Sequence, residues 1–149
     1  MARKLSFNLA RKLHELNIQI PSRDGYAIDH FSYFPPRINS EYEASPGTWI
    51  RDVDNCESEY SSISISNLTI PAPTLHDVED YFREVFDIFI SIRRIGDSMF
   101  RYMYDIEYPI HGKYVSIPGE VSNDYYDCLS NAIQAVLDDI LPMVKKSTK

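Results

Sequence analysis

Apolar side chains near the amino terminus recur at spacings of four and three residues. Residues 5–16, LSFNLARKLHEL, place four leucines on one helical stripe: Leu5, Leu9, Leu13 and Leu16. This period predicts an amphipathic helix over residues 5–16. Ser6 is its candidate N-cap, because a serine hydroxyl accepts a hydrogen bond from a free backbone N–H of the first turn.

The following stretch predicts short strands separated by loops. Residues 25–34, GYAIDHFSYF, are interpreted as one strand that ends at two prolines. Residues 48–53 (TWIRDV) and 61–66 (SSISIS) are interpreted as strands on either side of an acidic loop. In the second of these, we expect Ile63 and Ile65 to face the core while the serines face solvent.

A second helix is predicted where the apolar residues are again spaced three and four positions apart. In residues 70–86, IPAPTLHDVEDYFREVF, Thr74 stands at the N-cap position and Asp77 three residues later. This spacing is that of a capping box, with Asp in place of the preferred Glu or Gln. The apolar face of the helix is formed by Leu75, Val78, Phe82 and Val85.

Residues 88–108 alternate apolar and polar side chains around a turn at residues 96–98. This pattern predicts an antiparallel hairpin with one apolar and one mixed face. The apolar face comprises Ile88, Ile90, Ile92, Phe100, Tyr102, Tyr104, Ile106 and Tyr108. Residues 113–117 are expected to add a strand before Pro118-Gly119.

A third amphipathic helix is predicted over residues 122–141, with Ser122 or Asn123 as its cap and Pro142 ending or kinking it. Its core face is expected to contain Leu129, Ala132, Ile133, Val136, Leu137 and Ile140. The order helix, strands, helix, hairpin, helix predicts an α+β fold. We expect a single domain over residues 1–149, with an antiparallel sheet and about three helices packed on one face. The basic N-terminal residues and the tail 143–149 are expected to be flexible.

Two stretches carry a resemblance to known sequences. NLTIPAPTLHDVEDYF and YDCLSNAIQAVLDDIL, with the aromatic hairpin between them, resemble small uncharacterised proteins encoded by phages and prophages, especially those of gut Bacteroidetes. The shared pattern is a Pro-Thr-Leu helix entry, a strand hairpin and a closing helix rich in Ala and Leu. The resemblance covers less than half of the chain. It implies a mobile-element origin and carries over no catalytic motif.

Composition narrows the class of protein. The chain has 149 residues, of which 44% are hydrophobic and 25% charged, as in globular domains. No apolar run reaches the ~20 residues that span a bilayer, and the amino terminus lacks the apolar region of a secretory signal. We therefore expect a soluble, cytoplasmic protein without membrane contact. Cys56 and Cys128 belong to no paired motif, and Cys128 is expected to be a buried apolar residue.

Charge is distributed unevenly along the chain, whose formal net charge is −7. Residues 1–12 and 145–149 hold seven basic side chains and no acidic one, so residues 13–144 carry 8 basic and 22 acidic side chains. Such an acidic body is not expected to bind nucleic acid directly. It is either a solubilising surface or a face offered to a basic partner.

The sequence contains little that points to catalysis. The acidic loop 52–59 has Glu57 and Ile63 where a calcium loop needs Gly and Glu, and no two histidines have zinc-ligand spacing. Nucleophile and phosphate-binding motifs are also absent. We therefore expect no metal or cofactor and favour a protein that is not an enzyme. The alternative enzyme or ligand site would gather His30, Tyr104 and Asp105.

The aromatic hairpin has two interpretations. A row of rings on one strand face most often forms a core beneath a helix. It could instead be a partner surface, because Tyr, Trp and Arg are enriched at binding hot spots. The candidate partner-binding residues are Arg93, Arg94, Arg101, Tyr102, Tyr104, Tyr108 and Trp49.

These patterns lead to one functional hypothesis with alternatives. We expect a small acidic accessory protein of phage or prophage type that binds another protein, for example to inhibit a host or defence factor. In a variant of this hypothesis, carboxylates mimic nucleic-acid phosphates: Asp77, Asp80, Glu84, Asp138 and Asp139. The alternatives are the enzyme or ligand site above and a structural homo-oligomer formed through the hairpin edge.

Overall fold

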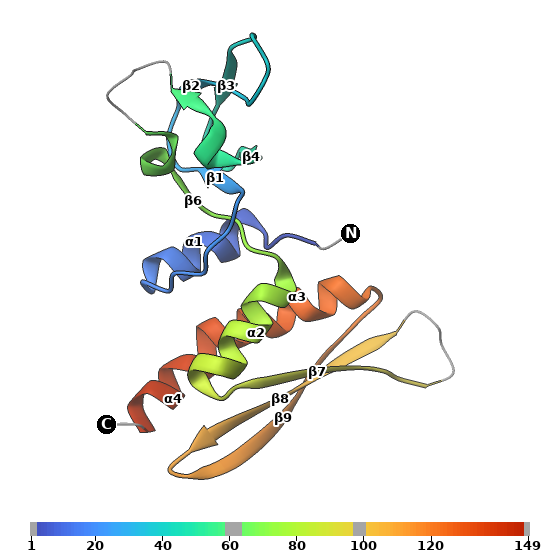
Figure 1. Cartoon of the computed structure of the whole chain (residues 1–149). Helices are drawn as coiled ribbons and strands as arrows, with labels where there is room; N and C mark the ends of the chain where they lie inside the picture. The colour runs from blue at the N-terminus through green and yellow to red at the C-terminus, as the bar shows by residue number, and fades with distance from the viewer. Residues whose placement is uncertain (1–2, 59–63, 97–100, 148–149) are drawn as a thin grey trace. The chain divides into compact units, whose positions relative to one another are not determined.

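The computed structural model describes residues 3–58, 64–96 and 101–147. The chain forms two compact units: an N-terminal unit, Lys4–Pro73, and a C-terminal unit that joins Thr74–Lys149 to Met1–Arg3. Both units contain helices and antiparallel sheets, which confirms the α+β class (Figure 1). The prediction of a single domain stays a prediction, and each unit is described by itself.

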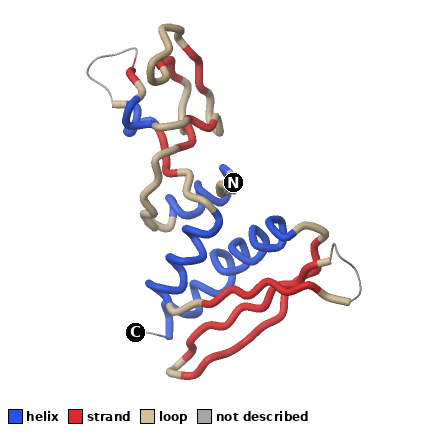
Figure 2. The backbone as a smooth tube through the Cα atoms, turned by 45° about the vertical axis from the view of Figure 1, so that its right-hand side comes forward, coloured by secondary structure: helices blue, strands red, loops and turns tan. Residues whose placement is uncertain are grey.

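The N-terminal unit is built from short elements joined by loops (Figure 2). Its helices are α1 (Phe7–Glu15) and the 3-10 helices η1 (Val53–Asn55) and η2 (Ile65–Leu68). Its strands are β1 (Gly25–Ala27), β2 (Phe31–Phe34), β3 (Tyr42–Ala44), β4 (Trp49–Ile50), β5 (Glu57–Ser58) and β6 (Thr69–Pro71). They form two three-stranded sheets with the orders β4-β1-β6 and β3-β2-β5.

The predicted strand 25–34 is divided in the structure. Residues 28–30 bend, so that β1 joins one sheet and β2 the other. Gly25 permits the close pairing of β1 with β6, because a Cβ there would lie 2.9 Å from the Ile70 carbonyl oxygen of β6. The division lets one short segment contribute to both sheets.

The other strand predictions in this unit hold only in part. Of residues 48–53, only β4 is a strand. Of residues 61–66, positions 61–63, including Ile63, lie outside the described residues, and the strand prediction is wrong at Ile65, which begins η2. Ile65 is nevertheless buried as expected, so the apolar period identified the core side chain but not the backbone conformation.

The N-terminal unit has a buried core of its own. One buried cluster consists of Ala27, Tyr33, Ala44, Ile50, Val53 and Ile65. Helix α1 begins at the predicted cap, where the Ser6 hydroxyl accepts a hydrogen bond from the Leu9 N–H. Its leucine stripe is buried at Leu9 and Leu13 but exposed at Leu16, which follows the last turn.

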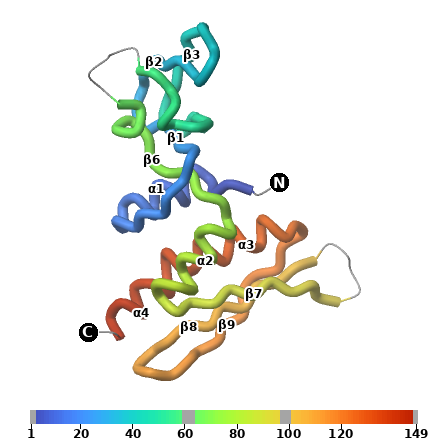
Figure 3. The backbone as a smooth tube through the Cα atoms, viewed as in Figure 1, coloured from blue at the N-terminus to red at the C-terminus, as the bar shows by residue number. Residues whose placement is uncertain are grey.

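The C-terminal unit is more regular (Figure 3). Its strands are β7 (Phe89–Arg94), β8 (Tyr102–Ile110) and β9 (Lys113–Ser122), and they form one antiparallel sheet in the order β7-β8-β9. Its helices are α2 (Leu75–Phe86), α3 (Tyr125–Ala135), a π-helical segment (Val136–Ile140) and α4 (Leu141–Ser147). The helices cover one face of the sheet, as predicted (Figure 1).

The predicted hairpin is present on both sides of residues 97–100, which lie outside the described residues. Ile92 pairs with Tyr104, and Ile106 pairs with Ile90 on one side and Ile117 on the other. β8 turns into β9 at His111-Gly112, where both residues have positive φ, as a two-residue hairpin turn requires. β9 then runs through Pro118-Gly119, where the prediction ended it.

The sequence predicted the N-cap of α2 correctly and misplaced that of α3. The Thr74 hydroxyl accepts from the Asp77 N–H and the Asp77 carboxylate accepts from the Thr74 N–H, which confirms the capping box. The predicted apolar face of α2 is wrong at Val85, which is exposed. α3 is capped by Asp124, one residue beyond the predicted alternatives. The Asp124 carboxylate accepts two backbone N–H groups there.

Pro142 neither ends nor visibly interrupts the last helix, which continues to Ser147. The residues before it widen into a π-helical turn in which the Leu141 N–H donates to the Val136 carbonyl. A wider turn near the proline accommodates the missing N–H of Pro142. All six predicted core residues of this region are buried: Leu129, Ala132, Ile133, Val136, Leu137 and Ile140.

Candidate binding site

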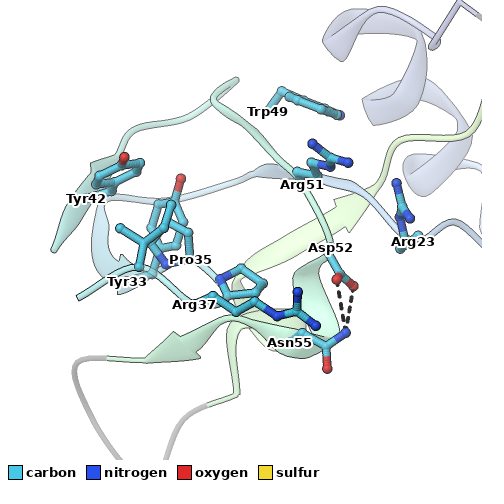
Figure 4. A pocket seen from close by; sticks show the side chains of 11 residues that line it. Arg23, Tyr33, Pro35, Arg37, Tyr42, Trp49, Arg51, Asp52 and Asn55 are labelled. Atoms are coloured by element: carbon cyan, nitrogen blue, oxygen red, sulfur yellow. Dashed lines mark hydrogen bonds between the residues drawn. The ribbon is translucent and has the colours of Figure 1, made fainter. Parts of the chain in front are cut away.

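An open hollow of about 970 Å³ lies in the N-terminal unit (Figure 4). Three arginines and three aromatic side chains dominate its lining: Arg23, Arg37, Arg51, Tyr33, Tyr42 and Trp49. In the view of Figure 4, the arginine side chains lie toward the end that holds Asp52, and the two tyrosine rings lie toward the other end. Positive charge and ring surface are thus available side by side.

Strand pairing positions the aromatic end of the hollow. Tyr33 of β2 pairs directly with Tyr42 of β3, and their rings meet edge to face with centroids 6.0 Å apart. Tyr33 is buried, whereas Tyr42 keeps 45% of its surface exposed. The buried ring therefore supports the exposed one.

Chain turns position the arginine end. Arg23 precedes β1, Arg51 follows β4, and β1 and β4 are paired strands. Arg37 lies after β2, beyond the two prolines, with a φ of 64°. A left-handed backbone is uncommon for a residue with a long side chain and costs free energy. The surrounding turn holds Arg37 in this conformation.

Hydrogen bonds hold the loop that carries Arg51. The Asp52 N–H donates to Asp24 Oδ1 at 2.9 Å, and the Asn55 amide donates to both carboxylate oxygens of Asp52 at 3.0 Å. Asp24 Oδ1 also lies 3.6 Å from the Arg23 Nε. The carboxylate of Asp52 in the lining and that of the neighbouring Asp24 are therefore already engaged in structural contacts.

The three arginines of the hollow differ in the ion pairs that they form with carboxylates. Arg23 has one loose ion pair, whereas Arg37 and Arg51 have no ion pair or hydrogen bond to a carboxylate within the described ranges. A further cation lies beside the hollow, because Lys4 Nζ stands 3.7 Å from the centre of the Trp49 ring. In a chain of net charge −7, this is a local concentration of positive charge.

Two titratable groups in or beside the hollow, Tyr33 and Cys56, have raised pKa values. Burial raises the pKa of the Tyr33 hydroxyl above its ordinary value, with smaller effects from Cys56 and Tyr42. Burial, followed by the negative charge of Asp52, raises the pKa of the Cys56 thiol. Because a thiolate is the nucleophilic form of cysteine, Cys56 is not activated for covalent chemistry.

The hairpin candidates do not form one exposed surface. Tyr104 and Tyr108 keep 8% and 6% of their surface and are core residues of the C-terminal unit, which supports the core interpretation of the ring row. Tyr102 is half-buried, with its ring 6.0 Å from that of Tyr125. Phe100 lies outside the described residues. Tyr104 and Tyr108 therefore have little surface to offer a partner.

The basic candidates of the hairpin differ from one another. Arg93 Nε donates to the Asp105 carboxylate at 2.9 Å, across the β7–β8 pair. Arg94 and Arg101 are exposed. Trp49, the remaining candidate, lies in the N-terminal unit and lines the hollow described above. The structure thus places Trp49 beside arginines that the sequence analysis did not single out.

The three residues of the alternative enzyme or ligand site belong to different units, His30 to the N-terminal unit and Tyr104 and Asp105 to the C-terminal unit. Tyr104 is buried, whereas the neighbouring Asp105 pairs with Arg93 on the other side of the strand. His30 is exposed in the N-terminal unit, where its N–H donates to the Asp29 carboxylate. Within the described residues, no three His, Cys, Asp or Glu side chains converge as metal ligands.

The proposed carboxylate stripe is partly engaged within the C-terminal unit. Asp77 belongs to the capping box and Asp80 pairs with Arg83 on the same helix. Asp138 also has an internal interaction. Carboxylates that cap or pair within their own helix have a structural role, so the mimicry variant of the hypothesis receives no added support.

Sequence reasoning missed Arg23, Arg37 and Arg51. The only signals were local: Arg37 follows two prolines, and Arg51 stands two residues after the single tryptophan. Arg23 and Arg51 approach one another through the β1–β4 pairing, which joins residues about 25 positions apart. No periodic pattern marks such an arrangement.

Comparison of the chain with protein-family models, with curated proteins and with solved structures finds no match. The resemblance to phage-type proteins therefore stays a prediction. Among the described residues, no helix combines the length and apolar character needed to cross a membrane.

Proposed function

We propose that this protein acts by binding another protein, and that the hollow of the N-terminal unit is its contact site. The observation that carries the proposal is the set of exposed Arg, Tyr and Trp side chains around one concave surface. These three residue types are enriched among the side chains that dominate binding energy at protein interfaces. The buried Tyr33 supports this surface from below.

The proposal retains the biological setting expected from the sequence. A small accessory protein of phage or prophage type, acting in the cytoplasm and inhibiting a host or defence factor, would work through such a contact. The supporting observations are the resemblance noted above and two cysteines that are both free thiols, as is usual in reducing compartments. The hollow also contains no activated nucleophile, which favours binding over catalysis.

A second candidate function is a homo-oligomer formed through the sheet of the C-terminal unit. β9 is an outer strand of ten residues, and it carries exposed Tyr114, Val115 and Val121. A long outer strand with apolar side chains is a template for pairing with a second copy. Light scattering after size exclusion would test this candidate, with Val121→Lys expected to convert an oligomer to a monomer.

The proposed function is tested by co-purification from a lysate of the source organism. The tagged full chain should recover one protein in stoichiometric amount, and Tyr42→Ala should abolish its recovery. Arg94→Gln, an exposed change on the hairpin, is the matched control and should leave recovery unchanged. No stoichiometric partner would overturn the proposed function, and loss with Arg94→Gln alone would move the contact to the hairpin.

A further inference from the structure

We infer that the hollow receives an acidic segment of its partner, with carboxylates at Arg23, Arg37 and Arg51 and an apolar or aromatic side chain against Tyr42 and Pro35. This inference rests on the proposed function, because it names the chemistry of the partner at that site. Three steps lead to it: the guanidinium groups that have few carboxylate partners among the described residues, the ring surface beside them, and the exposure of the lining residues.

The guanidinium groups define the anionic part of the ligand. Arg37 and Arg51 have no carboxylate partner within the described ranges, and the lining carries three arginines against a single carboxylate, that of Asp52. Asp52 is itself held by two hydrogen bonds from Asn55. A guanidinium presents paired N–H donors that match a carboxylate, so charge-assisted bonds from two or three arginines favour a segment with several acidic side chains.

The aromatic end defines the rest of the ligand. The exposed Tyr42 ring and the half-buried Pro35 present apolar surface next to the arginines. A ring or branched apolar side chain placed there would pack against Tyr42, edge to face in the case of a ring. An acidic segment that also contains such a residue would use both ends of the hollow at once.

The exposure of the lining favours a peptide over a free small molecule. Seven of the eleven lining residues are exposed, and Tyr33 is the buried one. Small-molecule sites bury most of their ligand inside an enclosed pocket. An open surface with Arg and aromatic side chains instead accommodates side chains presented by a chain that continues across it.

The charge of the whole molecule gives the site selectivity. Because the net charge is −7, an acidic partner is repelled over most of the surface and attracted at this hollow. Like-charge repulsion elsewhere suppresses other orientations of the same partner. Binding should therefore weaken steeply as salt rises, because the attraction lies between exposed charges.

The inference is tested by selection from a displayed library of random short peptides, with the labelled full-length protein as bait. Selected peptides should be enriched in Asp and Glu and should contain an aromatic or branched apolar residue. Their affinity should fall by about tenfold for each of Arg23→Gln and Arg51→Gln, as expected for the loss of one charge-assisted contact. Arg94→Gln, in the other unit, should leave affinity unchanged.

Three outcomes would overturn the inference: selection without enrichment of acidic residues, affinities insensitive to both arginine changes, or competitive displacement of the peptides by inorganic phosphate alone. The last outcome would identify a phosphate site instead. Circular dichroism and thermal unfolding of each variant establish that the chain is folded. Trp49, the single tryptophan, gives a direct fluorescence signal for occupation of the hollow.

The experiments distinguish a failure of the proposed protein-binding function from a failure of the acidic-segment inference. If co-purification recovers a partner that depends on Tyr42 but not on the arginines, the proposed function stands and the acidic-segment inference is overturned. If peptides are selected as expected but no protein partner is recovered from the lysate, the hollow binds acidic chains and the proposed function loses its support.

Discussion

Strand β8 of the C-terminal unit and the short strands β3 and β4 of the N-terminal unit place aromatic side chains in opposite environments. On β8, Tyr104 and Tyr108 lie on a nine-residue strand and are buried beneath helices. Tyr42 of β3 and Trp49 of β4 lie on strands of three and two residues and remain exposed beside arginines. The same residue types are core residues on the long strand and surface residues on the two short ones.

Strand length explains much of this difference. On the nine-residue strand β8, the alternate side chains of Tyr104, Ile106 and Tyr108 face the helices and are buried, in line with the two-residue period of a strand. Strands of two to four residues end before an alternation develops, and the turns that connect them direct side chains such as Arg37 and Arg51 outward. Binding residues are commonly carried by such turns on a supporting framework.

The largest effect is expected where the C-terminal unit is packed most closely. A Cβ at Gly119 would lie 2.0 Å from ring atoms of Tyr104, so the ring occupies the space that glycine leaves. Tyr104→Ala should lower the free energy of unfolding by about 3–5 kcal/mol and Gly119→Ala by about 1–3 kcal/mol. Urea unfolding measures both changes.

Three controls make this test specific. The penalty of Gly119→Ala should shrink once Tyr104→Ala has removed the ring, because the two residues share one contact. Glu107→Ala, an exposed change on the same strand, should alter stability by less than about 0.5 kcal/mol. Tyr42→Ala should cost about 1 kcal/mol at most. If Tyr104→Ala costs no more than Tyr42→Ala, the contrast between the units is wrong.

Alkaline pH should destabilise both units. Burial raises the pKa of Tyr104 and Tyr125 in one unit and of Tyr26 and Tyr33 in the other, from an ordinary value of 10.0. The folded chain therefore keeps these protons at a pH where the unfolded chain loses them. The stabilisation is complete below pH 10 and is lost as pH rises toward the raised values.

Urea unfolding at neutral pH and between about pH 9 and 11 measures this loss. The loss of stability should begin nearer pH 9, because burial also raises the pKa of the Cys128 thiol from its ordinary value of 9.0. Tyr104→Phe should reduce the slope of stability against pH, since it removes one of the shifted groups. A free energy of unfolding that rises with pH across this range would contradict the prediction.

The helix starts of the two units should differ in strength. Thr74 takes part in a reciprocal capping box, whereas Ser6 accepts one hydrogen bond, from Leu9, at 3.3 Å. Thr74→Ala should cost about 1 kcal/mol and Ser6→Ala about half as much. Thr74→Ser retains the hydroxyl and is the control, measured by the same denaturation. Equal costs at the two caps would show that the reciprocal bond adds nothing.

A similarly small effect is expected at the edge of the hollow. Lys4→Met removes the cation over the Trp49 ring and should cost about 0.5–1 kcal/mol. Because Trp49 is the single tryptophan, its emission should change in the same variant. Lys113→Met, an exposed change in the C-terminal unit, is the control. Unchanged emission with Lys4→Met would show that the cation does not lie over the ring in solution.

Sequence patterns predicted the C-terminal unit better than the N-terminal one. The capping box at Thr74, the alternation on β8 and the core face of α3 are local or strictly periodic signals, and each was confirmed. The cap of α3 was misplaced by one residue, because Ser122, Asn123 and Asp124 are all acceptable caps. Val85 was assigned to the core by mistake, because the buried face of α2 is narrower than the stripe of apolar residues along the helix.

Local sequence by itself determined where helices begin, which strand positions alternate and which side chains are apolar enough for a core. Only the tertiary structure decided that residues 25–34 serve two sheets, that Gly119 makes room for Tyr104, and that Arg23, Arg37 and Arg51 surround one hollow with Tyr42 and Trp49. The physical reason is the range of the interactions. Caps and periodic faces depend on residues a few positions apart, whereas the hollow depends on pairings between strands that are distant in the chain.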